Sequence, residues 1–275
     1  MAFDPKTKKY PYPEDTASHY IKIKKKYDLN FDRDYPYIDN SKGFKFKRFW
    51  VRFLLTFIVF PLSRLKIGLR IEGKKNLRKY KSVIKNGVIS VSNHIHYWDY
   101  IAIMKAVRPI KPYTLVWAEN IRGNTGNLVR LCGGIPIPEE SFGGKVAFNR
   151  TINDMLTDGG WLHLYAEGSM WEYYMPIRPF KMGAFTIAVN NDKPIIPMAF
   201  SYRKCGLIGK MFHLPARLTL RIGEPIFRNT KLSLNEQKLD LLYRCHDEVC
   251  RLANIDPKEN IYESIYNDSK RKDYY

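Results

Sequence analysis

The sequence lacks an apolar run long enough to cross a bilayer as one helix, which takes about 20 apolar residues. Its first 20 residues contain no apolar stretch typical of a secretory signal peptide, and no glycine follows Met1 as N-myristoylation requires. Cysteine is also scarce: Cys132, Cys205, Cys245 and Cys250 are scattered, with no CxxC pair. We therefore predict a chain that works in a reducing compartment, with its cysteines as small core residues.

Acidic residues are the second shortage. The chain of 275 residues has 46 Lys and Arg against 27 Asp and Glu, which gives a net charge of +19. This excess indicates an anionic partner, and nucleic acid, an anionic membrane face and an acidic protein all satisfy that requirement. The hydrophobic content of 45% is enough to build a core in one large domain or two small ones, so intrinsic disorder is a poor interpretation.

Nearly half of this charge lies in or just after one apolar segment. Between Val51 and Lys85 the chain has ten Lys or Arg and one acid, Glu72. The uncharged run 53–63, rich in Phe and Leu, begins this stretch and is bracketed by cations. Cations next to aromatic and leucine side chains are typical of a helix that lies in a membrane interface. We predict such an interfacial amphipathic helix at residues 44–66; a buried core helix with a solvated basic neighbour is the alternative.

The other segments differ in character. Residues 1–43 are polar and rich in Tyr and Lys, with turn signals and no sustained period, and are predicted to form an extension that lies over the main domain or the membrane. Residues 67–255 are predicted to form the main domain. Residues 256–275 form a polar tail.

The main domain alternates short apolar runs with helical stretches. Runs such as VISVS, WLHLY and PIIPMAF are apolar nearly throughout, as strands covered on both faces are. The sequence therefore predicts an α/β fold with a mostly parallel central sheet flanked by helices. The predicted strands are 69–72, 87–92, 113–117, 134–137, 161–165, 194–201 and 217–222. The predicted helices are 99–107, 125–132, 145–157, 181–190 and 234–253, the last with a capping box of Ser233 and Glu236.

A group of polar residues follows the strand that ends at Ser92, at the edge where such sheets carry their chemistry. If a helix begins near Trp98, Asp99 lies in its first turn and reaches back to one nitrogen of His94. The other nitrogen is then free to take a proton from a hydroxyl, so the two residues form a base and its orienting group. Two alternatives stay open: a metal-dependent hydrolase that uses His94, His96 and Asp99, and a purely structural histidine pair.

Four sequence blocks resemble the glycerolipid acyltransferase family, which includes the 1-acylglycerol-3-phosphate acyltransferases. In the family's order, they are Asn93, His94 and Asp99 in its NHxxxxD block; LYAEGSMW, with Glu167 and Gly168, in its FPEGTR block; Pro179–Phe185 in its PFKKGAF block; and Lys193–Phe200 in its PIIPVAI block. The resemblance covers about residues 69–225.

This resemblance implies an O-acyltransferase that moves a fatty acyl group from acyl-CoA or acyl carrier protein to a hydroxyl of a lysophospholipid-like acceptor. It makes His94 the general base and Asp99 its orienting group, and it requires no cofactor and no metal. The candidates for substrate binding are Asn93, Glu167, Gly168, Ser169, Arg178 and Lys181. Two positions depart from the family: Glu139 and Met170 stand where its phosphate-binding arginines are expected, so the acceptor's head group is left open.

The resemblance and the charge together indicate the partners. We expect an anionic membrane lipid surface, an acyl thioester donor and a lipid acceptor, with the protein peripheral or monotopic at the cytoplasmic face of a membrane. Nucleic acid is not expected, because the basic cluster borders an apolar run and no nucleic-acid motif is present.

Overall fold

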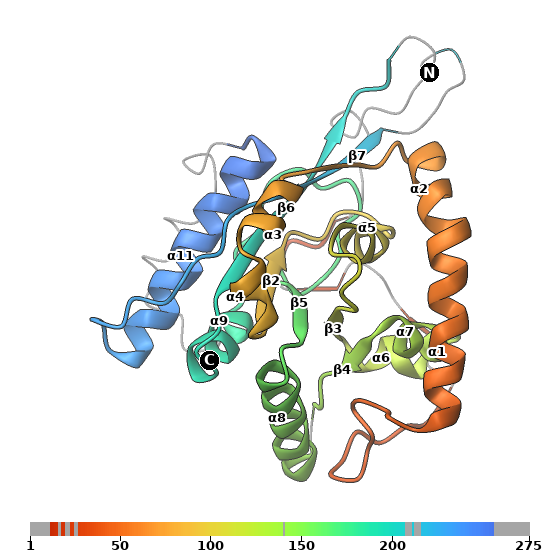
Figure 1. Cartoon of the computed structure of the whole chain (residues 1–275), viewed down its shortest axis with the longest axis vertical. Helices are drawn as coiled ribbons and strands as arrows, with labels where there is room; N and C mark the ends of the chain where they lie inside the picture. Colours follow the sequence, from red (N-terminus) through yellow and green to blue (C-terminus); the bar gives the residue numbers. More distant parts are fainter. Residues whose placement is uncertain are drawn as a thin grey trace.

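The computed structural model describes residues 12–15, 18–19, 23–24, 27–139, 141–206, 211 and 216–255 (Figure 1). Its centre is a seven-stranded sheet in the order β1-β7-β6-β2-β5-β3-β4. Neighbouring strands are parallel except for β6 and β7. The strands are β1 (Arg70–Glu72), β2 (Val88–Ser92), β3 (Tyr113–Val116), β4 (Gly134–Pro136), β5 (Trp161–Tyr165), β6 (Ile195–Arg203) and β7 (Arg217–Ile222). The predicted mostly parallel α/β fold is confirmed, and each predicted strand is present.

Helices occupy most of the connections. They are α1 (Lys42–Leu54), the π-helical segment η1 (Leu55–Val59), α2 (Phe60–Lys66), α3 (Lys74–Lys79), α4 (Lys81–Lys85), α5 (Asp99–Ala106), α6 (Ala118–Arg122), α7 (Gly126–Cys132), α8 (Phe142–Thr157), α9 (Gly183–Asn190) and α11 (Leu234–Ala253). The capping box of Ser233 and Glu236 is present at the start of α11, as predicted. Helix α8 begins three residues before its predicted start, because the Ser141 side chain caps it by accepting the N–H of Gly144.

Each face of the sheet is covered by its own hydrophobic cluster, and every residue of β2 is buried. Ile89 and Val91 pack with residues of α8, α9 and α11, whereas Val88 packs with residues of α5 on the other face. The four cysteines are free thiols buried in the protein, as predicted. Because β2 pairs with β5 and Ser92 lies opposite Tyr165, the loops that follow these two strands lie side by side.

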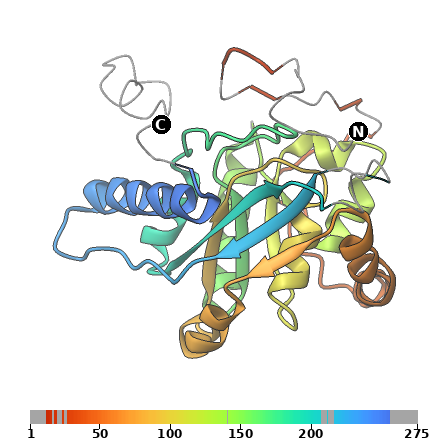
Figure 2. The same cartoon turned by 90° about the horizontal axis from the view of Figure 1, so that it is seen from above.

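The segments α1, η1 and α2 run on as one helix at the side of the molecule opposite α11 (Figures 1 and 2). The core-helix alternative is wrong for α1, since none of its residues is buried. The helix instead rests on the domain through Leu55 and Phe60, which pack with Met104 and Cys132. Its exposed hydrophobic side chains are Phe46, Phe49, Trp50, Phe53, Leu54, Phe57, Ile58, Leu62 and Leu65. Within the described ranges, every helix is too short or too polar to cross a membrane.

The chain before α1 belongs in part to the main fold. Phe31 and Tyr37 are buried in the same cluster as the inner residues of α8, and the Tyr37 hydroxyl donates to the Phe31 carbonyl at 3.0 Å. Residues 256–275, predicted as a polar tail, lie outside the described residues, as does part of the predicted extension.

Candidate active site

The loop between β2 and α5 wraps around the carboxylate of Asp99. Asp99 is the first residue of α5, and its Oδ2 lies 3.0 Å from Nδ1 of His94. The same oxygen accepts the backbone N–H groups of Ile95 at 2.8 Å and His96 at 3.0 Å. The predicted pairing of His94 with Asp99 is therefore present, and the loop's own backbone holds the carboxylate in place.

The surroundings of His94 favour a neutral imidazole. Burial lowers the pKa of His94, and it raises the pKa of Asp99 against the opposing effect of the N–H groups of His96 and Ile95. We place the imidazole proton on Nδ1, because Oδ2 of Asp99 already acts as an acceptor. The ring stacks on Tyr165 with centroids 3.6 Å apart. Its side chain is 23% exposed, and Nε2 has no hydrogen-bond partner among the described residues. Nε2 is thus positioned to accept a proton.

Glu167, in the loop after β5, braces this arrangement. Its Oε2 accepts the backbone N–H of His94 at 3.0 Å and the Arg178 Nη2 at 2.9 Å, and its Oε1 accepts the backbone N–H of Arg178 at 2.8 Å. Both side chains are almost fully buried. The carboxylate therefore joins the His94 loop to the loop after β5 by charge-assisted hydrogen bonds, which are stronger than neutral ones.

The loop after β5 carries three more predicted site residues. Gly168 adopts φ +81°, and a Cβ at this position would lie 2.8 Å from Nζ of Lys181, so glycine lets the lysine approach. Ser169 Oγ accepts from Arg178 Nη1 at 2.9 Å. Among the described residues no ion pair includes Lys181, and burial lowers its pKa. Arg178 lowers this pKa further, whereas the negative charge of Asp15 raises it.

Asn93, a predicted substrate-binding residue, has its side chain hydrogen-bonded to the protein backbone. It is fully buried, its amide donates to the Phe200 carbonyl at 2.9 Å, and its side-chain oxygen accepts the Phe200 N–H at 2.7 Å. These contacts fasten the end of β2 to β6.

His96 does not converge with His94 on a common point. Its Nδ1 accepts the backbone N–H of Trp98 at 3.0 Å, whereas Nδ1 of His94 faces Asp99. In the part of the chain that the structure describes, no group of three or more His, Cys, Asp or Glu side chains is arranged to hold a metal ion. The geometry therefore gives the metal-dependent hydrolase no support.

The two positions that depart from the family are both engaged with other protein groups. Met170 is buried. Glu139 accepts from Trp117 Nε1 at 2.8 Å and lies 3.5 Å from Nη1 of Arg122. The positive charge of Arg122 therefore offsets part of the negative charge of Glu139.

Residues of the N-terminal extension contact the loop after β5 and Trp117, and the sequence did not indicate which residues would do so. The Ser18 carbonyl accepts from Ser169 Oγ at 3.0 Å and from Trp171 Nε1 at 3.1 Å. Tyr12 stacks on Trp171 with ring centroids 5.4 Å apart, and His19 stacks on Trp117 at 4.1 Å. These described residues therefore lie against the main domain. Their identity carried no signal, because the segment has neither a motif nor a period.

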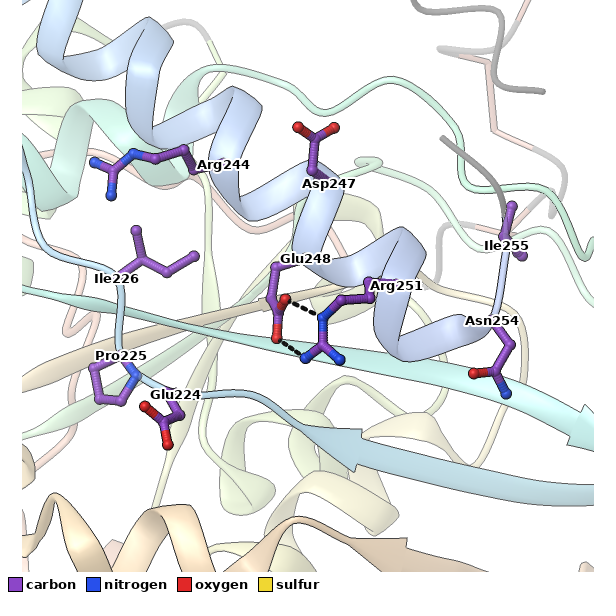
Figure 3. A pocket seen from close by; sticks show the side chains of 9 residues that line it. All are labelled: Glu224, Pro225, Ile226, Arg244, Asp247, Glu248, Arg251, Asn254 and Ile255. Carbon is purple, nitrogen blue, oxygen red and sulfur yellow. Dashed lines mark hydrogen bonds and ion pairs between the residues drawn. The ribbon is translucent and has the colours of Figure 1, made fainter. Parts of the chain in front are cut away.

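An open groove lies away from His94, between α11 and the segment that follows β7 (Figure 3). Its charged side chains are largely paired on the helix itself, Arg251 with Glu248 and Arg244 with Asp240. None of the predicted site residues lines it. The candidate site is therefore the one around His94.

Comparison with known proteins agrees with the geometry around His94. Residues 68–201 match the Acyltransferase family, and this range contains both loops of the site. The match covers 134 of the 275 residues, so this part of the chain is similar to that acyltransferase family.

One curated protein and one solved structure are also similar to parts of this chain. The mouse (Mus musculus) 1-acyl-sn-glycerol-3-phosphate acyltransferase alpha is 28% identical over 145 residues, which are 50% of this chain and 49% of the mouse protein. The chain thus spans about half the length of that relative. The crystal structure of the 1-acyl-sn-glycerophosphate (LPA) acyltransferase PlsC from Thermotoga maritima has a TM-score of 0.46 and 18% identity, over 77% of this chain and 84% of that chain.

The brace at Glu167 makes a prediction about stability. We expect Glu167→Gln to lower the free energy of unfolding by about 3–5 kcal/mol, because it leaves the buried Arg178 guanidinium without its counter-charge. Urea denaturation measures this. The matched control is Glu224→Gln, which removes a carboxylate from an exposed ion pair with Lys79 and is expected to change stability little. Equal effects of the two substitutions would show that Glu167 is not a brace.

Proposed function

We propose that the chain is a membrane-surface O-acyltransferase that moves a fatty acyl group from acyl-CoA or acyl carrier protein to a hydroxyl of a lysophospholipid-like acceptor. The observation that carries this proposal is the pair of His94 and Asp99, which lies within the matched range and leaves Nε2 of the histidine without a hydrogen-bond partner among the described residues. The name of the mouse protein supports a lipid acceptor of this class.

The reaction needs one base and one acid, and His94 serves as both. Nε2 removes the proton of the acceptor hydroxyl as its oxygen attacks the thioester carbonyl. The imidazolium that forms is stabilised by Asp99 across the 3.0 Å contact. When the carbonyl re-forms, the C–S bond breaks and the thiolate leaves as a thiol with the proton from Nε2. No covalent acyl-enzyme is required.

The acceptor's head group is assigned to the side of the site formed by Ser169 and Lys181. Lys181 supplies a cation without an ion pair among the described residues, and the Ser169 hydroxyl lies between Arg178 and the N-terminal extension. Arg178 itself is committed to Glu167, so it contributes by positioning the loop. In this assignment, Ser169 and Lys181 bind the head group in place of the two arginines that the family has at the positions of Glu139 and Met170.

Membrane contact is assigned to the exposed face of the helix from α1 to α2. The same helix carries cations that suit anionic lipid, while its aromatic side chains are exposed to solvent. A helix of this composition binds the interface by burying its apolar face and attracting lipid phosphates. We place the enzyme at the cytoplasmic face of a membrane.

Catalysis by His94 and Asp99 is tested by single substitutions. We expect His94→Ala and Asp99→Asn each to lower acyl transfer by about 100-fold to 10,000-fold, because each removes the base or its orienting group. Transfer of a labelled acyl chain from acyl-CoA to a panel of lysophospholipid, glycolipid and aminolipid acceptors measures this. Asp247→Asn, an exposed aspartate on α11, is the control and should keep full activity. Retained turnover in the His94 variant, with wild-type turnover present, would overturn the assigned roles.

Membrane docking by the helix makes a separate prediction. Replacing Phe49, Phe53 and Phe57 together with serine should weaken binding to anionic vesicles by at least about 100-fold, because three exposed aromatic side chains lose their burial in lipid. Co-sedimentation with phosphatidylglycerol-containing vesicles measures the change. Phe142→Ser removes a phenylalanine that is 82% exposed on α8 and should leave binding unchanged. Equal binding of the triple variant and wild type would contradict the proposed docking face.

A further inference from the structure

Two arginines of α1 have guanidinium atoms buried against the domain. Arg48 and Arg52 are four residues apart, so they lie on one face of the helix. Neither residue is buried as a whole, but Nε and Nη2 of both are buried and have no hydrogen-bond partner. Most buried polar atoms in proteins are hydrogen-bonded, so four orphaned donors in one place call for an explanation.

Neutral side chains contact this arginine pair. Arg48 Nη1 donates to the Tyr113 hydroxyl at 2.9 Å, and the Arg48 guanidinium lies over the Tyr113 ring. Tyr100 and Cys132 lie near Arg52, and burial raises the pKa of both, so neither is an anion at neutral pH. Among the ion pairs of the described residues, none includes either arginine.

The pair is therefore electrostatically unfavourable as it stands. Burial and the neighbouring charge of Arg48 both lower the pKa of Arg52. A buried charge without a partner is strongly destabilising, and two like charges side by side add repulsion. An anion held between the two guanidinium groups would satisfy the orphaned donors and cancel the repulsion.

A hollow of about 10 Å³ lies beside Arg48 and has room for about one water molecule, so an anion must move side chains apart to enter it. Its lining includes Tyr113, Arg130, Gly133 and Asp39. Gly133 has φ +107°, and a Cβ there would lie 2.6 Å from the Pro112 carbonyl oxygen, so the position requires glycine. Asp39 is a charged carboxylate in the same lining, because the N–H of Ser41, which it accepts at 2.9 Å, lowers its pKa; it therefore opposes an incoming anion.

We propose that Arg48 and Arg52 form a binding site for a phosphate group between α1 and the domain. Phosphate is the anion that matches the planar forks of two guanidinium groups. The site is separate from His94 and does not depend on acyl transfer. Since Tyr100, beside Arg52, directly follows Asp99, a phosphate here would fasten the interfacial helix to the helix that carries the orienting carboxylate.

The test is thermal unfolding of the full chain with and without inorganic phosphate at constant ionic strength. We expect phosphate at one hundred times its Kd to raise the Tm of the wild type by about 5–10 °C. Arg52→Met should abolish this rise. In phosphate-free buffer the same variant should unfold at or above the wild-type Tm, because methionine fills the space without an unpaired charge. Arg64→Met, an exposed arginine on α2, should keep the full phosphate response.

A second arm identifies the source of the phosphate. Soluble dihexanoyl phosphatidic acid is added in place of inorganic phosphate, to the wild type and to Arg52→Met. A rise in Tm that depends on Arg52 with the lipid alone identifies a lipid head-group site, and a rise with inorganic phosphate identifies a free phosphate site. No Arg52-dependent rise with either ligand would overturn the proposal. A phosphate-free Tm of Arg52→Met well below wild type would also overturn it, because that result assigns the arginine to packing.

Discussion

The buried carboxylate of Glu167 is the interaction on which the site depends. The sheet places the ends of β2 and β5 side by side, but the register alone leaves the loops beyond them undefined. Glu167 joins them by accepting the backbone N–H of His94 and two donors of Arg178. Two further backbone hydrogen bonds, from Trp171 to the His94 carbonyl and from Tyr173 to the Ile95 carbonyl, extend the same junction. The position of the His94 backbone therefore depends on Glu167, which comes after the neighbouring strand β5 and is 73 residues later in the chain.

The chemistry of His94 follows from that fixed backbone. Asp99 can hold Nδ1 because its carboxylate is itself held by the N–H groups of the loop, and Tyr165 supports the flat face of the ring. Burial keeps the imidazole neutral, and a neutral imidazole with one open nitrogen is what proton removal requires. The N-terminal extension then closes over the neighbouring loop through Ser18 and Tyr12. The site therefore draws on a part of the chain that lies outside the matched family range.

Much of the fold could be predicted because its signals are local. The apolar runs of β2, β5 and β6 and the capping box of α11 are properties of a few consecutive residues. The pairing of His94 and Asp99 was also local, since it needs only a strand end and a helix start. The short helices α3, α4 and α6 were missed because five or six residues are too few to show a helical period.

The remaining parts of the site depend on contacts between distant segments. The contacts of Asn93 with Phe200 and of Glu167 with Arg178 require the strand order, which spacing does not reveal. Similarly, the charge count around α1 indicated an anionic partner. It did not show which cations face solvent and which, like Arg48 and Arg52, have buried guanidinium atoms.

The protonation state of His94 tests the central claim most directly. In protein labelled with ¹⁵N-histidine, the ring nitrogens of His94 are assigned by their absence in the His94→Ala variant and followed by NMR from pH 8 downward. The account predicts a neutral ring with its proton on Nδ1 at neutral pH, and a pKa below the ordinary 6.5 because the site is buried. An imidazolium at pH 7, or a neutral ring with its proton on Nε2, would contradict it.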